Sequence, residues 1–342
     1  MIREAIIAIV DERRDLSEQE ATAVMHEIMG GEATDVTEAQ FGAFVTALRM
    51  KGESVEEITG MAKAMREHAL RVEIEARPLL DTAGTGGSRK IFNASTAAAF
   101  VAAAGGAKVA KHGNRAMTSK SGSADFLEAL GAEIALTPEQ VASCIDRCGI
   151  GFMFAQSFHP AMKFAGPLRP QIGIRTIFNI LGPLTNPAGA NSHVMGVATP
   201  ELGRTMAAVL ANLGIRHALV VTGEDGLDDI SVCAPTTTFE VRGSEVTEGN
   251  LTPEQIGLSR HSPDEIEGGD AERNAEIMRQ VFAGEGPVAV RDLILANAGA
   301  GLYVTGLASS VRVGVDQAKD LVANGDAAAR VAAFVEATRR AG

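Results

Sequence analysis

Residues 81–96 read DTAGTGGSRKIFNAST, and this stretch decides the predicted fold. It continues a short apolar run at 79–80 and precedes an alanine-rich segment, so a strand, a glycine turn and a helix follow one another. This order is typical of a layered α/β protein.

The glycine loop itself also indicates chemistry. Glycines can adopt positive φ and let backbone amides approach an anion closely, while a helix start offers free amides and a favourable dipole. The loop therefore suits a phosphate or pyrophosphate; a plain glycine turn capped by Ser95 is an equally good interpretation of this loop alone. The residues concerned are Gly84, Gly86, Gly87, Asn93, Ser95 and Thr96.

Further strand patterns alternate with helical ones along the next 140 residues. KVAKHG (108–113), IGFMFA (150–155), SHVMGVA (192–198) and HALVVTG (217–223) are the strand candidates. The alternation predicts the α/β class, with a mostly parallel central sheet and helices on both faces. TTTFEVRG (236–243) and the residues after it predict a hairpin beside that sheet, and the last hundred residues are helical.

The first 70 residues predict helices only, with capping boxes at Ser17 and Glu20, Thr37 and Gln40, and Ser54 and Glu57. Five prolines between 160 and 187, around a helix-like IRTIFNILG (174–182), suggest a crossover that packs on this helical part. We therefore expect a helical domain over 1–70, with a returning segment at about 165–186. The α/β domain is expected over 71–164 and 187–342.

Composition limits the class of protein. The chain has 342 residues, 46% apolar and 22% charged, which excludes disordered and collagen-like chains. A net charge of −12 disfavours a surface that binds nucleic acid or anionic membranes throughout. Three cysteines, at 144, 148 and 233, form no disulfide or zinc framework, and the amino terminus lacks a signal-peptide pattern. We expect a soluble, reduced, cytoplasmic protein without a membrane segment.

A second polar loop, KHGNRAMTSKSGSAD (111–125), follows the next predicted strand. Its bases Lys111, Arg115 and Lys120 supply positive charge, and its amide and hydroxyl side chains can surround phosphate oxygens. A basic run is commonly just a solvated surface, and His112 alone is more often structural. Two such loops at successive strand ends favour the binding interpretation, because open α/β sheets bind ligands at that edge.

A third polar loop, GEDGLDDIS (223–231), follows another predicted strand. Asp228 and Asp229 could hold two hard cations that bridge polyphosphate oxygens. Taken alone, a solvated acidic turn is the better interpretation of this loop.

The segments DTAGTGG, FNAST, KHGNR, SKSGSAD, HPAMK, GIRTIFNILGPLTNP and GLDDIS occur in this order. In order and spacing the chain resembles the anthranilate phosphoribosyltransferase family of tryptophan biosynthesis over essentially its whole length. The resemblance implies a homodimer, formed through the helical domain, of chains with a nucleoside-phosphorylase-like fold. It also implies transfer of phosphoribose from 5-phosphoribosyl-1-pyrophosphate to anthranilate, in a cleft between two domains, with magnesium and two ions at the pyrophosphate.

The resemblance also implies the site residues. Anthranilate would contact Gly84, Asn114 and Arg169. The phosphoribosyl donor would contact Gly84, Gly87, Asn93, Ser95, Thr96, Lys111, His112, Gly113, Asn114, Arg115, Ala116, Met117, Thr118, Ser119 and Ser123. Magnesium would be held by Ser95, Asp228 and Asp229, directly or through water.

Two departures from the family pattern bear on donor affinity and magnesium dependence. Ser88 stands where the family has aspartate, and Ile91 stands where a phosphate-facing threonine is typical. Neither residue is assigned as a ligand. The acidic pair is Asp-Asp rather than the commoner Asp-Glu, which shortens the reach at Asp229.

Two other function classes remain open from the sequence. A pyrimidine nucleoside phosphorylase shares the fold type and uses inorganic phosphate, whereas GPLTNP and the acidic pair favour a pyrophosphate donor. A non-enzymatic paralogue that binds nucleic acid would need a continuous basic surface. The windows 82–124 and 147–200 hold ten bases and no acid, so we expect one positive cleft, sized for a small polyanion, in an acidic body.

Overall fold

The computed structural model describes residues 1–30, 35–86, 91–116 and 120–341. Its helical elements are α1 (Ile2–Val10), α2 (Glu18–Ile28), α3 (Glu38–Lys51), α4 (Val55–Glu67), α5 (Ala94–Ala104), α6 (Ser123–Leu130), α7 (Pro138–Cys148), α8 (Ala155–Phe158), η2 (Pro160–Lys163), α9 (Ala165–Ile172), α10 (Phe178–Leu181), η3 (Gly182–Leu184), α11 (Pro200–Asn212), η4 (Pro263–Ile266), α12 (Ala271–Phe282), α13 (Val288–Thr305), α14 (Val311–Ala323) and α15 (Asp326–Ala341). The strands are β1 (Leu79–Gly84), β2 (Lys108–Gly113), β3 (Ile150–Phe154), β4 (Ser192–Gly196), β5 (His217–Gly223), β6 (Thr236–Arg242) and β7 (Glu245–Leu251).

The described strands form one sheet in the order β3-β2-β1-β4-β5-β6-β7. The first five strands in this order pair in parallel, and β6 and β7 add an antiparallel hairpin. The predicted α/β class, the parallel sheet and the hairpin are therefore confirmed. Because β1 leads on to β2 on one side and pairs with β4 on the other, the connection direction reverses between β1 and β4. Open sheets bind ligands at the carboxyl ends of strands beside such a reversal.

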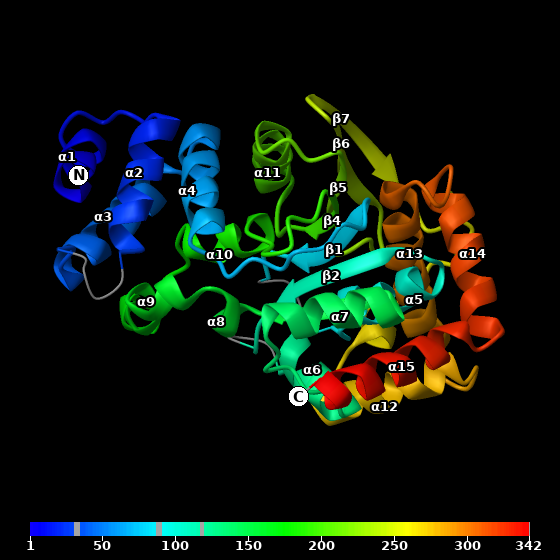
Figure 1. The fold of residues 1–342 in the computed structure, drawn as a ribbon. Coiled ribbons are helices and arrows are strands. Elements are labelled where there is room, and N and C mark those ends of the chain that lie inside the picture. The colour runs from blue at the N-terminus through cyan, green and yellow to red at the C-terminus, as the bar shows by residue number, and fades with distance from the viewer. Residues whose placement is uncertain (31–34, 87–90, 117–119, 342) are drawn as a thin grey trace.

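The period of two along each strand divides the apolar core into two layers. In β5, Leu219 and Val221 join the cluster built on α5 and α13, whereas Ala218 and Val220 join the cluster that contains α11 and the amino-terminal helices. Figure 1 shows α13 and α5 on one side of the sheet and α11 on the other. Helices thus cover both faces, as the alternating pattern predicts.

The amino-terminal helices begin at the three capping boxes that the sequence predicts, at Ser17, Thr37 and Ser54. Each side-chain oxygen accepts the backbone N–H three residues on, and the Glu or Gln side chain there accepts the N–H of the cap residue in return. The apolar stripe of α4 is buried at Ile58, Met61 and Met65, but Leu70 is 44% exposed. Leu70 lies beyond the helix, because α4 ends at Glu67.

The proline-rich crossover packs on the amino-terminal helices (Figure 1). The ring of Phe41 in α3 lies 5.9 Å from that of Phe164 and 5.6 Å from that of Phe178, measured between centroids. The helix expected over IRTIFNILG is wrong for its first half: α10 has four residues, and 173–176 are not helical. Gly173, at φ 73°, ends α9 and prevents a continuous helix.

The apolar cluster of the helical part also includes residues of β4, β5 and α11, such as Met195, Val220 and Leu210. The helical part therefore shares its core with one face of the sheet. The division into domains over 1–70 with 165–186, and over 71–164 with 187–342, stays a prediction.

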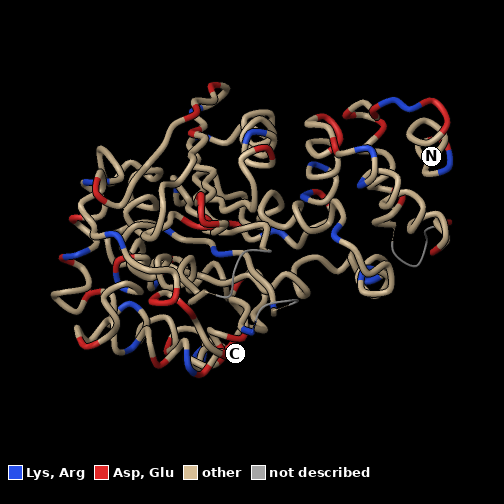
Figure 2. Tube along the Cα trace, turned by 180° about the vertical axis from the view of Figure 1, so that it is seen from behind, with Lys and Arg blue, Asp and Glu red and all other residues tan. Residues whose placement is uncertain are grey.

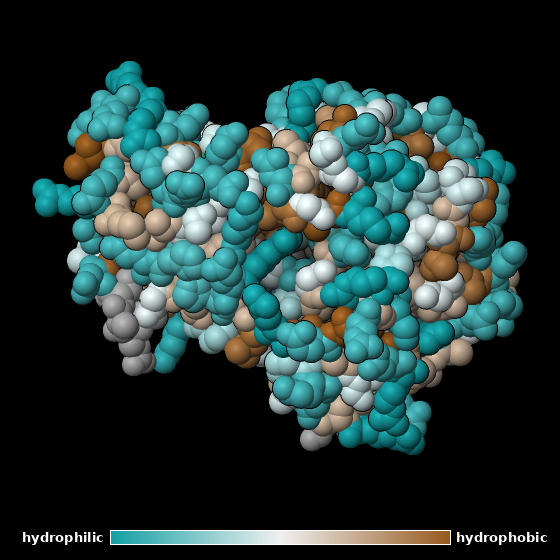
Figure 3. Space-filling view, turned by 45° about the horizontal axis from the view of Figure 1, so that its top comes forward, coloured by the Kyte–Doolittle hydropathy of each residue, from teal (hydrophilic) through white to brown (hydrophobic). Residues whose placement is uncertain are grey.

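Two surface properties bear on the function classes left open above. Acidic and basic positions are interspersed over the outer helices of the described chain (Figure 2). Figure 3 shows a face that is mostly hydrophilic, with apolar residues in small groups. No helix among the described residues is long and apolar enough to cross a membrane.

Candidate active site

The carboxyl ends of β1, β4 and β5 meet beside the reversal of strand order. Gly84 pairs with Gly196, and Thr85 N–H donates to the Gly196 carbonyl at 2.9 Å. The loop after β5 crosses directly over this pair. A Cβ atom added to Gly196 would lie 1.6 Å from the carbonyl oxygen of Asp228, and one added to Gly84 would lie 2.9 Å from the Asp228 Oδ2. Position 196 therefore requires glycine for Asp228 to lie where it does, whereas a side chain at position 84 would displace only the end of the Asp228 side chain.

Helix α5 presents its amino terminus at the same edge. The helix begins at Ala94, and its cap residue Asn93 makes no side-chain cap bond. Ser95 is the second helical residue, so the interpretation of Ser95 as the cap is wrong. The N–H groups of Ser95 and Thr96 have no partner among the described residues. Free amides at a helix start bind anions.

The glycine loop begins just after β1, and it has the positive φ that its glycines predict. Gly86 has a φ of 65°, while residues 87–90, including the predicted ligand Gly87 and the unusual Ser88, lie outside the described residues. Ile91 is partly buried against the core and pairs with Glu267 in an isolated bridge. Its environment agrees with leaving Ile91 out of the ligand set.

The third polar loop, residues 223–231, is called the acidic loop because it carries the adjacent carboxylates of Asp228 and Asp229. Burial, followed by the charge of Asp228, raises the pKa of Asp229 well above its ordinary value, and the ammonium of Lys111 acts in the opposite direction. No group of three or more His, Cys, Asp or Glu that could hold a metal occurs among the described residues. A cation at this pair would therefore need further oxygen ligands from a bound molecule.

The side chain of Lys111 is turned into the sheet. It is 3% exposed, and its ammonium donates to the carbonyl and, at 3.3 Å, to the hydroxyl oxygen of Thr82. Burial lowers the pKa of Lys111, and the carboxylates of Asp81 and Asp229 oppose this shift. Asp81 is fully buried and accepts from the His112 N–H at 3.2 Å and from Asn186 Nδ2 at 2.7 Å. The ammonium of Lys111 is thus buried in the sheet, where its charge favours the ionised forms of Asp81 and Asp229.

The second polar loop is tied to the start of α6 by Asp125. Its Oδ2 accepts from the Ala116 and Gly122 N–H groups, each at 2.9 Å. Asp125 and Glu128 also hold the guanidinium of Arg115, which is itself exposed and lies 5.6 Å from the Phe154 ring centroid. Arg115 therefore contributes less free positive charge than the sequence alone suggests.

The other predicted residues of this loop are placed as follows. Ser123 Oγ donates to the Asn114 carbonyl at 3.3 Å and lies against Gly113, where an added Cβ would come within 2.1 Å of it. Lys120 is exposed. Met117, Thr118 and Ser119 lie outside the described residues.

A histidine pair lies between β2 and the crossover. The rings of His112 and His159 are 5.0 Å apart, and His112 Nδ1 lies 3.2 Å from the Gly182 carbonyl oxygen. The Nε2 atoms of both rings are buried without a hydrogen-bond partner among the described residues. Burial lowers the pKa of His112 to about 3 and that of His159 to about 4, so both rings are neutral at pH 7.

Two arginines of the crossover have different neighbours. The Arg169 guanidinium lies 5.8 Å from the Phe178 ring centroid, and burial lowers the pKa of this group. Arg175 donates to the carbonyl oxygens of Thr85 and Gly86, at 2.9 and 3.0 Å, and so joins the crossover to the glycine loop. The sequence interpretation singled out neither His159 nor Arg175. Their presence in HPAMK and GIRTIFNILG was the available signal.

The histidine pair predicts how stability depends on pH. Between about pH 4 and 6.5 the unfolded chain binds more protons at these rings than the folded protein does, because both folded pKa values lie below 6.5. Stability therefore falls as the pH falls through this range, by up to about 1.4 kcal/mol per pH unit for each ring. We expect His159→Gln to make this fall shallower in urea unfolding at pH 7, 6 and 5. The raised carboxyl pKa values act oppositely but are common to both proteins, so equal slopes would contradict the prediction.

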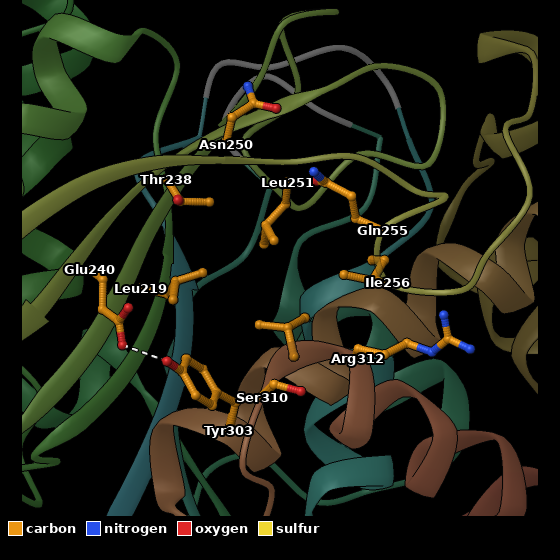
Figure 4. A pocket seen from close by; sticks show the side chains of 11 residues that line it. Leu219, Thr238, Glu240, Asn250, Leu251, Gln255, Ile256, Tyr303, Ser310 and Arg312 are labelled. Atoms are coloured by element: carbon orange, nitrogen blue, oxygen red, sulfur yellow. Dashed lines mark hydrogen bonds between the residues drawn. The ribbon is translucent and has the colours of Figure 1, made fainter.

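A cavity of about 430 Å³ lies elsewhere, between the hairpin and helices α13 and α14 (Figure 4). Leu219, Leu251, Ile256 and Val311 contribute apolar groups, and Glu240 accepts a hydrogen bond from the Tyr303 hydroxyl at 2.8 Å. Leu219 lies near the amino end of β5, away from the acidic loop. None of the predicted site residues that the structure describes lines this cavity.

Comparison with known families defines the class of protein. Residues 3–69 match the helical bundle domain of the glycosyl transferase family, and residues 76–328 match the a/b domain of the same family. The chain is thus a member of this glycosyl transferase family.

Individual relatives define the family more narrowly. Anthranilate phosphoribosyltransferase of Rubrobacter xylanophilus is 52% identical over 326 residues, which cover 95% of this chain and 94% of the relative. The crystal structure of the Thermus thermophilus enzyme has a TM-score of 0.91 and 42% identity, with 99% of each chain covered. The Saccharomyces cerevisiae enzyme, in complex with PRPP and Mg, has a TM-score of 0.90 and 26% identity over 99% of this chain and 98% of its own. The chain belongs to the anthranilate phosphoribosyltransferase family.

Proposed function

We propose that this protein transfers the phosphoribosyl group of 5-phosphoribosyl-1-pyrophosphate to the amine of anthranilate and releases pyrophosphate, a step of L-tryptophan biosynthesis. One observation carries the proposal beyond family membership. The free amides at the start of α5 and the Asp228–Asp229 pair converge on one edge of the sheet, at the carboxyl ends of β1, β4 and β5. An anion and its counter-cations could therefore bind next to each other at this edge.

The donor side rests on backbone groups more than on side-chain charge. Among the described residues the Ser95 and Thr96 N–H groups have no partner and can receive phosphate oxygens, and Gly84 presents backbone without a side chain at the same sheet edge. Lys111 is buried and Arg115 is paired, so we expect them to act by positioning and by long-range charge. The remaining donor residues, from Gly87 through Asn93 to Ser123, are proposed on the family resemblance.

Magnesium fits the acidic pair. Two carboxylates whose mutual repulsion and burial raise the pKa of Asp229 gain from a bound cation, and Mg²⁺ commonly takes one or two carboxylates together with substrate phosphates. The yeast relative was solved in complex with PRPP and Mg. Asp228 and Asp229 would hold the metal with Ser95, which would neutralise charge that develops on the departing pyrophosphate. Two ions with the pyrophosphate are part of the proposal.

The acceptor side lies between β2 and the crossover. Asn114 and Arg169, with Gly84, are the proposed anthranilate contacts, and an arginine fork suits a carboxylate. The neutral His112 and His159 rings add buried Nε2 atoms that lack a partner among the described residues. They extend the proposed acceptor site beyond the residues that the sequence indicates.

The proposed phosphoribosyl transfer requires positioning and charge stabilisation rather than a strong base. Departure of pyrophosphate gives the ribose oxocarbenium character, and the aromatic amine of anthranilate is already neutral at pH 7. The chain therefore has to align the amine with the anomeric carbon and stabilise the leaving group. This agrees with a site of amides, carboxylates and neutral histidines.

The test is the fluorescence of anthranilate mixed with the purified protein. We expect the signal to fall only when 5-phosphoribosyl-1-pyrophosphate and magnesium are both present, because donor and metal bind together at the sheet edge. Omission of either, and addition of EDTA, are the controls. A constant signal with both present would refute the proposal, and phosphorolysis of thymidine or uridine in its place would favour a nucleoside phosphorylase.

A homodimer through the helical part and a location in the cytoplasm belong to the same proposal. Val10 and Met50 of the helical part are 53% and 84% exposed, and Figure 3 shows apolar residues at the left end, over the amino-terminal helices. All three cysteines are free, as a reducing compartment allows. Light scattering is expected to give about twice the chain mass of 35.6 kDa. A value near one chain mass would exclude the dimer.

A further inference from the structure

A buried asparagine far along the chain supports Asn93, the residue that links the two polar loops proposed to bind the donor. Asn274 in α12 is 0% exposed, and its Nδ2 donates to Asn93 Oδ1 at 2.8 Å. Ser121 Oγ donates to the same oxygen at 2.9 Å, and Asn93 Nδ2 donates to the Ser121 carbonyl at 3.2 Å. Asn93 precedes α5, and Ser121 belongs to the second polar loop.

Backbone groups at both ends fix the direction of these amides. The Gly269 N–H can only donate, and it donates to Asn274 Oδ1 at 2.7 Å. Asn274 must therefore turn its Nδ2 toward Asn93, which must present its oxygen in return. The Asn93 Nδ2 then faces the Ser121 carbonyl, which can only accept. Reversal of either amide would set two donors or two acceptors against each other.

The segment before α12 also supports the donor loop directly. The Phe92 N–H donates to the Ile266 carbonyl at 3.3 Å, and Ile91 pairs with Glu267. An added Cβ at Gly268 would lie 2.7 Å from the Ile91 carbonyl oxygen, so the two backbones pack against each other. The start of α5 is thus held by a segment about 180 residues further along the chain.

We propose that Asn274 is a positioning residue that sets the spacing between the two donor-binding loops. The proposal rests on the proposed function, because it takes those loops to bind the phosphoribosyl donor. Asn274 is fully buried, and it acts through Asn93, which in turn bonds Ser121. Loss of its N–H leaves Asn93 held by Ser121 alone, so the start of α5 and the second polar loop lose their common support from α12. The first consequence is weaker donor binding, whereas the acceptor region beside His112 is left in place.

The test compares Asn274→Asp and Asn274→Ala with the native protein. Aspartate keeps the shape and the acceptor for Gly269 but replaces the donor that faces Asn93 by an oxygen. We expect the KM for 5-phosphoribosyl-1-pyrophosphate to rise at least about tenfold, with the KM for anthranilate and kcat each changed less than about threefold. Calorimetric titration with this donor and magnesium should show the same loss of affinity.

Met278→Ala is the matched control, because Met278 is 1% exposed on the same helix, one turn further on. It should lower stability and leave the KM for the donor unchanged. A double variant of Asn274→Ala with Asn93→Ala should bind the donor no more weakly than Asn93→Ala alone.

The outcomes separate the two proposals. An unchanged KM for the donor in the folded Asn274 variants, or equal donor defects in Met278→Ala, would overturn the role of Asn274. If Asn274→Ala does not fold, Asn274→Asp and the milder Ser121→Ala decide the question. A native protein that does not consume anthranilate with this donor would refute the proposed function instead.

Discussion

Asp229→Asn is expected to lower the turnover of anthranilate at least about 100-fold and, at the same time, to stabilise the free protein. The carboxylate is a proposed magnesium ligand, and an amide cannot supply its charge. Burial and the charge of Asp228 raise its pKa, so its ionised form costs folding free energy at pH values above the folded pKa. This cost disappears as the pH falls, because the raised pKa lets the folded protein take up the proton first.

Thermal unfolding at pH 8 and pH 5, with and without magnesium and 5-phosphoribosyl-1-pyrophosphate, checks the stability half of this prediction. The free variant should be more stable than the native protein at pH 8 and less clearly so at pH 5. Stabilisation by metal and donor should shrink. Steady-state kinetics check the expected loss of turnover.

Asp228→Asn tests the second carboxylate of the proposed metal site, and Glu224→Gln is the control. Asp228→Asn should weaken magnesium-dependent turnover far more than anthranilate binding. Glu224 is an exposed carboxylate in the same loop, and its removal should change neither property. Turnover of Asp229→Asn within threefold of the native value, or an unaltered response to magnesium, would remove Asp229 from the metal site.

Gly196→Ala is expected to reduce turnover about 100-fold without removing any polar group. The added Cβ would lie 1.6 Å from the Asp228 carbonyl oxygen, so the acidic loop must move away from the end of β4. A misplacement of about 1 Å near the reacting groups can cost about 100-fold in rate. Crowding of this kind typically costs about 1–3 kcal/mol of stability, which urea unfolding would show.

Two other glycines test whether the effect comes from the contact. An added Cβ at Gly84 meets the flexible end of Asp228 at 2.9 Å, so Gly84→Ala should have a smaller effect. Gly42, within α3, has nothing within 4 Å of such a Cβ, and Gly42→Ala should stabilise the helix by about 0.5–1 kcal/mol with normal turnover. Equal activity of all three variants would show that the acidic loop does not need its observed position.

Local patterns determined most of the fold. Alternation of strand and helix patterns, ends marked by glycine, and capping boxes at Ser17, Thr37 and Ser54 all report conformations set by neighbours in the chain. The order of the polar loops also predicted that they meet at one sheet edge, since parallel strands bring their carboxyl ends together. The pattern failed over IRTIFNILG, where Gly173 ends α9 just before the stretch and α10 begins only at Phe178.

The assignment of charge within the site depended on three dimensions. The sequence counts Lys111 and Arg115 as free cations, but the fold turns one into the sheet and pairs the other with Asp125 and Glu128. A residue's charge is known from its type, whereas its partners depend on which segments come together. The expected positive cleft is therefore reduced to the amides of α5 and the more distant bases.

By itself, the sequence determined the class of fold, its family and the loops that carry the chemistry, because these depend on residue types in local order. Only the tertiary structure decided that Asp228 lies on Gly84 and Gly196, that His159 joins His112, and that Asn274 holds Asn93. Hydrogen bonds and close contacts between residues far apart in the chain produce no periodic pattern in the sequence. They arise when the apolar faces pack and fix the distances between the loops.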